Sequence, residues 1–391
     1  LVSPLEGISN PFTGGGTSCW WRYQLLFDLM PKRRREDLYD FEEEMRALMD
    51  ACAGGRLVVI TALRRMGKTS LLLTSLNEGK LPYVFLDARR VVGVPGARGL
   101  AEELERGVNE FVAGRSSVSA RFLELLRGVR GVDVDLVRPS VRVHWGRRDR
   151  LDVAAALERL DDAARGAGTR IVVALDEAQE FRTAAPWLPR LLAYAYDHLE
   201  GIVLVVSGSQ VGVLRDFLGV DDPHGALYGR FLHEVRLRRL SREEAVDYLR
   251  RGFSEVGVAP PEDVLQEAVE RFDGIIGWLT YFGWSYSKGM GDVESILDMA
   301  ARQEAEELRR FLSGSVAARR YRAILKAAAR GPASWSSLKG AVEVEDGVEV
   351  DPHNFNDLLQ RLVKMGFLER EGNGRYVFAD RVLATAAAKY V

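Results

Sequence analysis

The feature that most constrains the fold is a loop between a buried strand and a helix. Residues 57–61 read Leu-Val-Val-Ile-Thr, an apolar run that predicts a buried strand. The next segment, residues 62–70, ends in Gly67-Lys68-Thr69-Ser70 and leads into a helical stretch. A glycine, four residues and then Gly-Lys-[Ser/Thr] in this context is the pattern of a phosphate-binding loop, whose backbone N–H groups face an anion. Only the first glycine differs, because Ala62 stands in its place.

Two side chains of this loop have distinct expected roles. Lys68 would place its charge on the β- and γ-phosphates, and Thr69 would offer its hydroxyl to Mg²⁺. The chain has 46 arginines and only eight lysines, so a lysine at this position departs from its general preference for arginine. An arginine fork would be too bulky at such a position, which favours a functional lysine. The alternative is a Gly-Lys-Thr sequence that merely caps a helix.

An acidic pair follows another apolar run. Residues 171–175 read Ile-Val-Val-Ala-Leu and are followed by Asp176 and Glu177. A carboxylate at the end of a buried strand needs a cation or a hydrogen-bond network. We expect Asp176 to hold Mg²⁺ through water and Glu177 to polarise the attacking water. Together with the loop, this pair predicts a nucleoside triphosphatase.

Two further polar residues have an open interpretation. Ser209 follows the apolar run 202–206, where it could contact the γ-phosphate or the attacking water. The alternative is a strand that simply ends in a glycine turn. Arg230 precedes the last strand-like segment and could read the γ-phosphate. In a chain this rich in arginine, it could equally be a surface residue.

The alternation of apolar strands and helices predicts an α/β fold with a parallel sheet covered by helices. We expect an N-terminal tail (1–26), a P-loop NTPase core (27–238), a helical lid subdomain (239–315) and a winged-helix domain (316–391). Within the core, residues 100–128 read as helical. In the last domain, three helical stretches precede two short strands joined by Gly-Asn-Gly at 372–374, which is a hairpin signal.

Composition excludes several classes. The chain of 391 residues has 54 basic and 56 acidic side chains, so any nucleic-acid site must be a local patch. The third helix of the last domain, residues 353–364, is expected to leave five polar side chains outside: Asn356, Asp357, Gln360, Arg361 and Lys364. This domain could therefore contact DNA, or it could serve for packing as part of a lid. Two cysteines and the lack of a long apolar run predict a cytoplasmic protein without a membrane helix.

Six segments together resemble the archaeal ATPase family, which belongs to the P-loop STAND branch related to the AAA+ ATPases. They are residues 34–40, 63–69, 145–151, 175–179, 227–231 and 273–279. The likeness runs from about Phe27 to the C-terminus and implies the same three-part architecture. It implies that Asp37, Leu38 and Tyr39 lie near the adenine or ribose, and it extends the nucleotide site to the loop residues Arg64, Arg65, Met66, Gly67, Lys68, Thr69 and Ser70. Two positions depart from the family pattern: Ala62, and Ile276 where the lid often has proline.

The expected function is that of a Mg²⁺-dependent protein that binds ATP and ADP. It would hydrolyse ATP slowly and use the nucleotide state as a conformational switch. The preference for ATP over GTP rests on the family likeness. One alternative is a DNA-associated ATPase that binds through the winged helix, and another is a nucleotide-stabilised scaffold with negligible turnover. A protein partner or a second copy of the chain also remains open.

Overall fold

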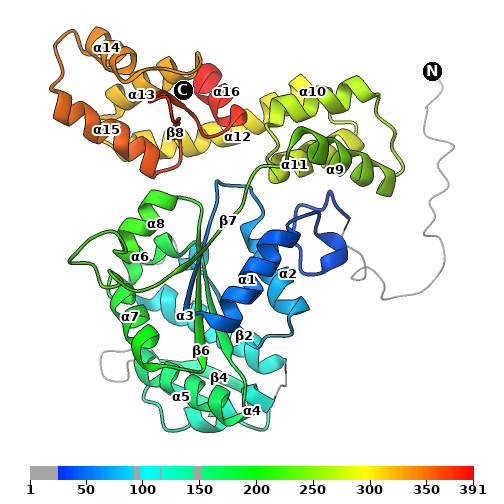
Figure 1. Cartoon of the computed structure of the whole chain (residues 1–391), viewed down its shortest axis with the longest axis vertical. Helices are drawn as coiled ribbons and strands as arrows, with labels where there is room; N and C mark the ends of the chain where they lie inside the picture. The colour runs from blue at the N-terminus through cyan, green and yellow to red at the C-terminus, as the bar shows by residue number, and fades with distance from the viewer. Residues whose placement is uncertain (1–24, 92–96, 115–116, 145–151) are drawn as a thin grey trace.

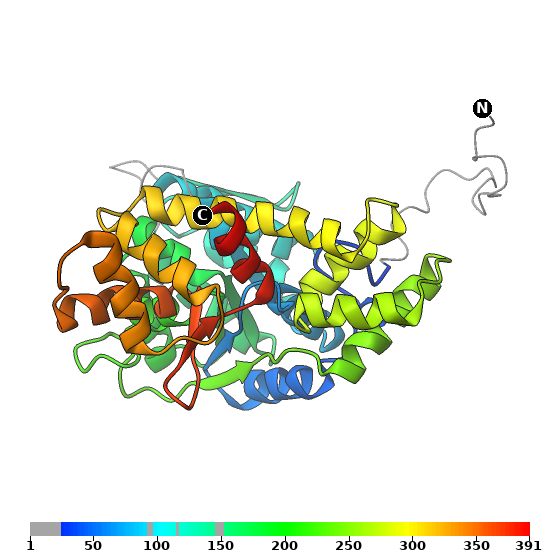
Figure 2. The same ribbon diagram turned by 90° about the horizontal axis from the view of Figure 1, so that it is seen from above.

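The computed structural model describes residues 25–91, 97–114, 117–144 and 152–391. Nearly all of the predicted N-terminal tail and the segment 145–151 lie outside these residues. The described chain forms an α/β body that carries two helical parts above one end of its sheet (Figure 1). These two parts correspond to the predicted lid and winged helix, and the long helix α12 (Val293–Ser313) runs from one to the other, as Figure 2 shows from above.

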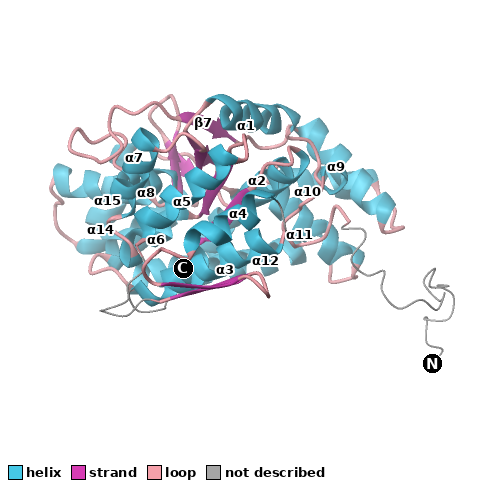
Figure 3. Ribbon diagram, turned by 90° about the horizontal axis from the view of Figure 1, so that it is seen from below, coloured by secondary structure: helices cyan, strands magenta, loops and turns pink. Residues whose placement is uncertain are grey.

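The central sheet is parallel, as predicted, with the strand order β2-β5-β6-β1-β7. Its strands are β1 (Leu57–Thr61), β2 (Tyr83–Asp87), β5 (Ile171–Asp176), β6 (Ile202–Gly208) and β7 (His233–Arg236). Every residue of β1, β5 and β6 is buried, because helices cover both faces of the sheet (Figure 3). Alternate residues of β1 therefore enter two different apolar cores: Val58 and Ile60 pack on one face, and Leu57 and Val59 pack on the other.

The helices of the body divide between these two faces. On the face of Val58 lie α1 (Glu42–Gly54) and α2 (Lys68–Glu78). The apolar core on the opposite face takes in α3 (Ala97–Ala113), α4 (Ser117–Leu126), α5 (Val153–Gly166), α6 (Phe181–Ala184), α7 (Leu188–His198) and α8 (Val211–Leu218). The predicted helical stretch 100–128 is thus two helices, and the first ends just before Gly114. A small antiparallel pair, β3 (Val132–Asp135) and β4 (Ser140–Val143), lies beside α3.

The remaining helices and the last hairpin follow the sheet. The lid contains α9 (Arg242–Glu255), α10 (Glu262–Phe272) and α11 (Ile276–Ser287). The winged helix contains α13 (Ala318–Ala328), α14 (Trp335–Asp346), α15 (Pro352–Lys364), β8 (Leu368–Arg370), β9 (Tyr376–Phe378) and α16 (Arg381–Tyr390). The hairpin β8–β9 confirms the sequence prediction. Helix α16, which the sequence analysis did not predict, returns to pack against α12.

One apolar core joins the lid and the winged helix to the body. It contains Val58 of the sheet, Trp278 of the lid and Phe355 of the winged helix, each almost fully buried. Burial of apolar side chains is the main stabilising term in folding. The three parts are therefore held in a defined arrangement around the end of the sheet where β1 leads into α2.

Candidate nucleotide site

The candidate site lies where the parallel strands end. The loop 62–67 follows β1, Asp176 ends β5, and Ser209 follows β6 directly. Because carboxyl ends of parallel strands meet at one edge of the sheet, these segments converge, and ligands of open α/β sheets bind at such an edge. The geometry brings together three residues expected to act on a nucleotide: Lys68, Glu177 and Asp176.

The loop has the backbone conformation that an anion site requires. Gly67 has φ +83° and Arg65 has φ +61°, so two residues are left-handed within one short loop. Any side chain at position 67 would strain this backbone, which explains the glycine. Helix α2 begins at Lys68, so its N-terminal N–H groups point into the loop. Ala62 is buried and its φ is not positive, so the methyl group in place of the first glycine is accommodated.

Thr69 and Asp176 form the candidate metal site. The Thr69 hydroxyl donates to Asp176 Oδ2 over 2.7 Å, and Ser207 donates its hydroxyl to Oδ1. Burial raises the pKa of the fully buried Asp176, while these two hydrogen bonds oppose the rise. A hydroxyl and a carboxylate oxygen at hydrogen-bond distance are the hard oxygen ligands that Mg²⁺ prefers. The residues present therefore fit a magnesium ion.

Lys68 and Glu177 form the charged centre of the site. The ammonium Nζ lies 3.6 Å from Glu177 Oε1, and both side chains are largely buried. Glu177 Oε2 accepts hydrogen bonds from Ser209 N at 2.9 Å, Ser209 Oγ at 2.7 Å and Gln179 Nε2 at 2.8 Å. Burial alone would raise the pKa of Glu177, but the charge of Lys68 and these donors lower it to about 2. Burial lowers the pKa of Lys68, and Glu177 opposes that change.

A cavity of about 440 Å³ opens beside this centre, lined by residues of the loop, of the segment before α1 and of the lid. This volume lies in the range of small-ligand sites. Asp37, Leu38 and Tyr39, which the resemblance places near the adenine or ribose, all line it. Asp37 is only 4% exposed, and burial raises its pKa. Its Oδ2 lies 4.0 Å from Arg34 Nε and accepts no hydrogen bond from the described residues. The Tyr39 hydroxyl instead donates to Asp247 Oδ2 of α9 over 2.7 Å, which ties this wall to the lid.

Four other predicted nucleotide contacts are engaged with protein groups. Arg64 forms an ion pair with Glu307 of α12. Arg65 pairs with Glu304 of the same helix at 3.1 Å, and its guanidinium lies 3.9 Å from the Trp278 ring centroid. The side chain of Met66 is buried, and the Ser70 hydroxyl accepts a hydrogen bond from the backbone N–H of Lys32. The arginines thus join the loop to the lid.

Ile276, which departs from the family pattern, lies at this same junction. It begins α11 and lines the cavity. The next residue, Gly277, donates its N–H to the Arg65 carbonyl over 2.8 Å, and a Cβ there would lie 2.5 Å from that oxygen. The lid therefore approaches the loop backbone directly, even without proline.

Arg230 is not brought to the loop. It donates to Asp197 of α7 at 2.5 Å and 3.0 Å and to the Ala226 carbonyl. Asp197 lies just before β6 and Arg230 just before β7, so both lie at the amino ends of parallel strands. The phosphate-binding loop lies at the carboxyl ends. A contact between Arg230 and a phosphate held by the loop of the same chain is therefore ruled out in this arrangement.

Arg89 is a residue of this site that was not expected from the sequence. This residue follows β2, lines the cavity, and holds Asp87 at 2.8 Å and Asp176 Oδ2 at 3.3 Å. The available signal was the same as for Asp176, namely charged residues directly after an apolar strand. Arg89 places a second cation beside the acids of the site.

Comparisons with known proteins agree with this geometry. Residues 38–282 match the model of an ATPase domain found predominantly in Archaea. The chain belongs to the archaeal ATPase family. Residues 315–379 match the C-terminal winged helix-turn-helix domain of MCM proteins, which confirms the predicted winged helix.

Solved structures of this fold extend the likeness over nearly the whole chain. The Walker-type ATPase PABY2304 of Pyrococcus abyssi is 32% identical, with a TM-score of 0.78, and the match covers 93% of this chain and 99% of the other. The ORC2 protein of Aeropyrum pernix, solved in ADPNP and ADP complexes, is 14% identical, with a TM-score of 0.58 over 93% and 95% of the two chains. A comparison with curated proteins found no match. In the described part of the archaeal ATPase chain, none of the helices has the length and apolar character needed to cross a membrane.

Proposed function

We propose that this member of the archaeal ATPase family binds ATP with Mg²⁺ in the cavity beside Lys68, hydrolyses it slowly, and transmits the nucleotide state to its C-terminal domain. The observation that carries the proposal is the pairing of Lys68 with Glu177 beside the Thr69–Asp176 contact. Lys68 would bind the β- and γ-phosphates as a point charge. A bound Mg²⁺ would neutralise charge at the phosphate oxygens. Thr69 and Asp176 are the residues that would hold it.

Slow turnover follows from the state of Glu177. A general base works best when its pKa lies near the working pH. Before nucleotide binds, Lys68 and the donors on Ser209 and Gln179 stabilise the charge of Glu177 and lower its pKa to about 2. When Lys68 binds the phosphates, the Ser209 and Gln179 donors would still hold the carboxylate. Such a carboxylate orients water and can accept its proton, but less readily than a base whose pKa lies near the working pH. Ser209, which the sequence placed near the γ-phosphate or water, would then act by holding Glu177.

The segment Asp37–Tyr39 supports adenine over guanine. The buried Oδ2 of Asp37 lies in the wall of the cavity, 4.0 Å from Arg34 Nε, and among the described residues no group donates a hydrogen bond to it. A buried acceptor without a hydrogen bond is costly, and the exocyclic amino group of adenine is a donor. Guanine presents a carbonyl oxygen at the corresponding position, which a carboxylate would repel.

The proposal is tested by measuring ATP and ADP affinity with and without Mg²⁺, on the wild type and on Lys68→Ala. We expect wild-type binding that Mg²⁺ strengthens and a variant without detectable affinity, because the charge opposite the phosphates is lost. Lys80→Ala is the matched control, since Lys80 is exposed at the end of α2. Equal affinity in the wild type and Lys68→Ala would contradict the proposal.

A further inference from the structure

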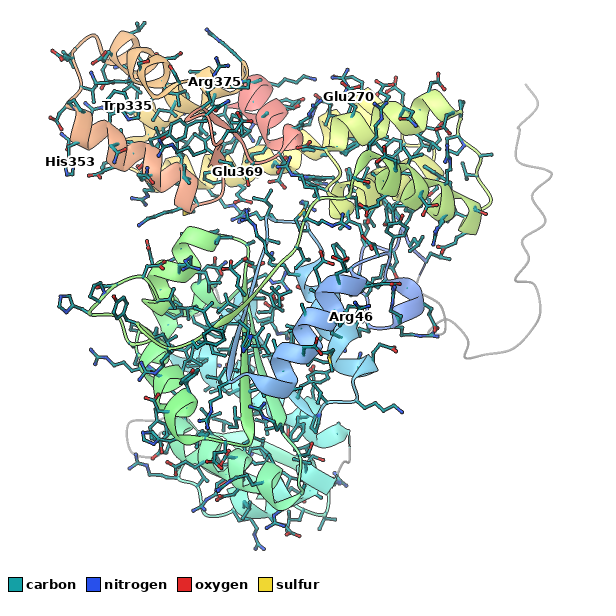
Figure 4. All side chains as sticks on the ribbon, viewed as in Figure 1. Arg46, Glu270, Trp335, His353, Glu369 and Arg375 are labelled. Atoms are coloured by element: carbon teal, nitrogen blue, oxygen red, sulfur yellow. The ribbon has the colours of Figure 1, made fainter. Side chains whose placement is uncertain are left out.

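The winged helix has one side that faces the body and one that faces away. On the body side, Lys364 at the end of α15 donates to Asp216 of α8 at 2.7 Å. A Cβ on Gly212 of α8 would lie 2.7 Å from the Lys364 backbone, so the two helices are in close contact. Glu369 of β8 pairs with Arg239 at 3.6 Å, and Figure 4 shows Glu369 directed towards the body. The C-terminal end of α15, for which DNA contact and packing were both open, is thus packed against the body through Lys364.

On the opposite side, a groove runs between α13 and α14. Its polar lining comes mainly from Lys326, Arg330, Arg375, Ser334 and Ser337. Arg375 lies on the side of the winged helix that is turned away from the body (Figure 4). Apart from Glu345, the remaining walls are small or apolar residues of the two helices and of the turn 331–333 between them, and no aromatic side chain is among the described residues that line the groove.

The three cations of this groove are free. Lys326, Arg330 and Arg375 are exposed, and within the described part of the chain no carboxylate forms an ion pair with any of them. Their neighbours differ in this respect, because Arg319 and Arg320 at the start of α13 pair with Glu345 and Asp346 of α14.

The remaining charges of the groove support an anionic occupant. The acid of the groove, Glu345, is thus already neutralised by Arg319. The N-terminus of α14 lies at the same end and contributes its positive dipole; its N-cap Ser334 accepts a hydrogen bond from the Ser337 N–H at 3.1 Å. The groove therefore presents positive charge without an internal counter-charge.

We propose that this groove, defined by Lys326, Arg330 and Arg375, binds the phosphate backbone of duplex DNA. Most protein contacts to a duplex go to phosphates, from lysine, arginine, serine and helix N-termini, which are the groups present here. Single-stranded nucleic acid is usually held by aromatic stacking platforms, and the groove has none. The contact would be independent of sequence and would leave α15 docked on the body. It goes beyond the proposed ATPase activity and does not require turnover.

The test is the fluorescence anisotropy of a labelled duplex with the full chain at about 50 mM and about 200 mM salt. We expect wild-type binding that weakens steeply with salt through counterion release. Lys326→Glu, Arg330→Glu and Arg375→Glu should each reduce low-salt affinity at least about tenfold and lower the salt slope by about one. Arg46→Glu reverses an exposed arginine on α1 (Figure 4), far from the groove, and should bind as the wild type does.

The melting temperature of each variant shows whether it is folded. As a second control, the milder variants Lys326→Ala and Arg330→Ala should also weaken DNA binding. Unchanged affinity in the folded groove variants would overturn the proposal, as would the absence of wild-type binding at low salt. A loss of binding with Arg361→Glu on α15 but not with the groove variants would also overturn it. The proposal would likewise be overturned if the wild type bound polyglutamate, an anionic polymer without phosphates, and did not bind the duplex.

Discussion

At the residue scale, Glu177 is held by three hydrogen bonds and by Lys68. Glu177→Gln would keep the shape and most of these contacts but could not accept a proton. We therefore expect ATP affinity close to that of the wild type and phosphate release reduced on the order of 10²- to 10⁴-fold. An ATP-binding measurement checks the affinity, and a single-turnover measurement checks the rate of phosphate release. Wild-type turnover in the variant would remove Glu177 from the mechanism.

Arg230 can meet a γ-phosphate only on a second copy of the chain, because it lies at the amino ends of the strands with Asp197. If it acts there, Arg230→Ala and Lys68→Ala should each be inactive alone, and mixing them should restore phosphate release. The restored sites would combine an intact loop from one chain with an intact arginine from another. Absence of recovery in a mixture, with both proteins folded, would leave Arg230 as a structural partner of Asp197.

At the element scale, α12 connects the loop to the winged helix through the pairs Arg64–Glu307 and Arg65–Glu304. Replacing both glutamates with glutamine should leave ATP affinity within a few fold, because neither acid lines the cavity. In the wild type, we expect bound nucleotide to protect the C-terminal domain against proteolysis. The double variant should lose this protection. Glu306→Gln is the control, since this exposed acid of α12 pairs with Arg309 alone among the described residues. Protection that persists in the double variant would show that the pairs do not transmit the nucleotide state.

Helix α16 carries a pH-dependent cap. Asp380 accepts a hydrogen bond from the Leu383 N–H, while burial raises its pKa from 3.8 to about 6. The folded state therefore binds this proton more tightly than the unfolded state, and stability decreases as the pH rises from about 4 to about 6. Asp380→Asn keeps the accepting oxygen without the charge. It should raise the free energy of unfolding at pH 8 by on the order of 1–3 kcal/mol and change it little near pH 4.

Thermal unfolding at the two pH values measures this difference. Asp292→Asn, at the exposed cap of α12, is the matched control, because hydrogen bonding to Ser295 lowers the pKa of Asp292. That variant should gain no stability at pH 8. Equal behaviour of the two variants would show that the charge of Asp380 does not destabilise the fold.

The elements that the sequence predicted well share a strong local signal. Strands β1, β5 and β6 are apolar on both faces, and the Gly-Asn-Gly turn indicated the β8–β9 hairpin. Helix α16 lacks such a signal, because its packing partner α12 lies far back along the chain. The β3–β4 pair gives only a short one, since each of its strands has four residues. The same limit applies to side chains. Spacing predicted the loop and the acids, whereas the pairing of Arg64 and Arg65 with α12 depends on residues more than 200 positions away.

At the scale of the whole molecule, the winged helix contacts the ATPase body close to the acids of the site. A Cβ on Gly366, just after α15, would lie 3.5 Å from the carbonyl of Ser209, and Ser209 binds Glu177. Helix α8, which follows Ser209, holds α15 through Asp216. A change at Glu177 on nucleotide binding therefore has a short physical path to the C-terminal domain, besides the path through α12.

The most direct test of the account is the steady rate of phosphate release by the purified full chain with ATP, with and without Mg²⁺, beside Lys68→Ala. We predict Mg²⁺-dependent release well below the typical enzyme rate of about 10 s⁻¹. The rate should nevertheless lie clearly above that of the variant, because the proposal places Lys68 on the phosphates, Thr69 and Asp176 on the metal ion, and Glu177 on the attacking water. A wild type that binds ATP but releases phosphate no faster than Lys68→Ala would contradict the account and identify a nucleotide-stabilised scaffold.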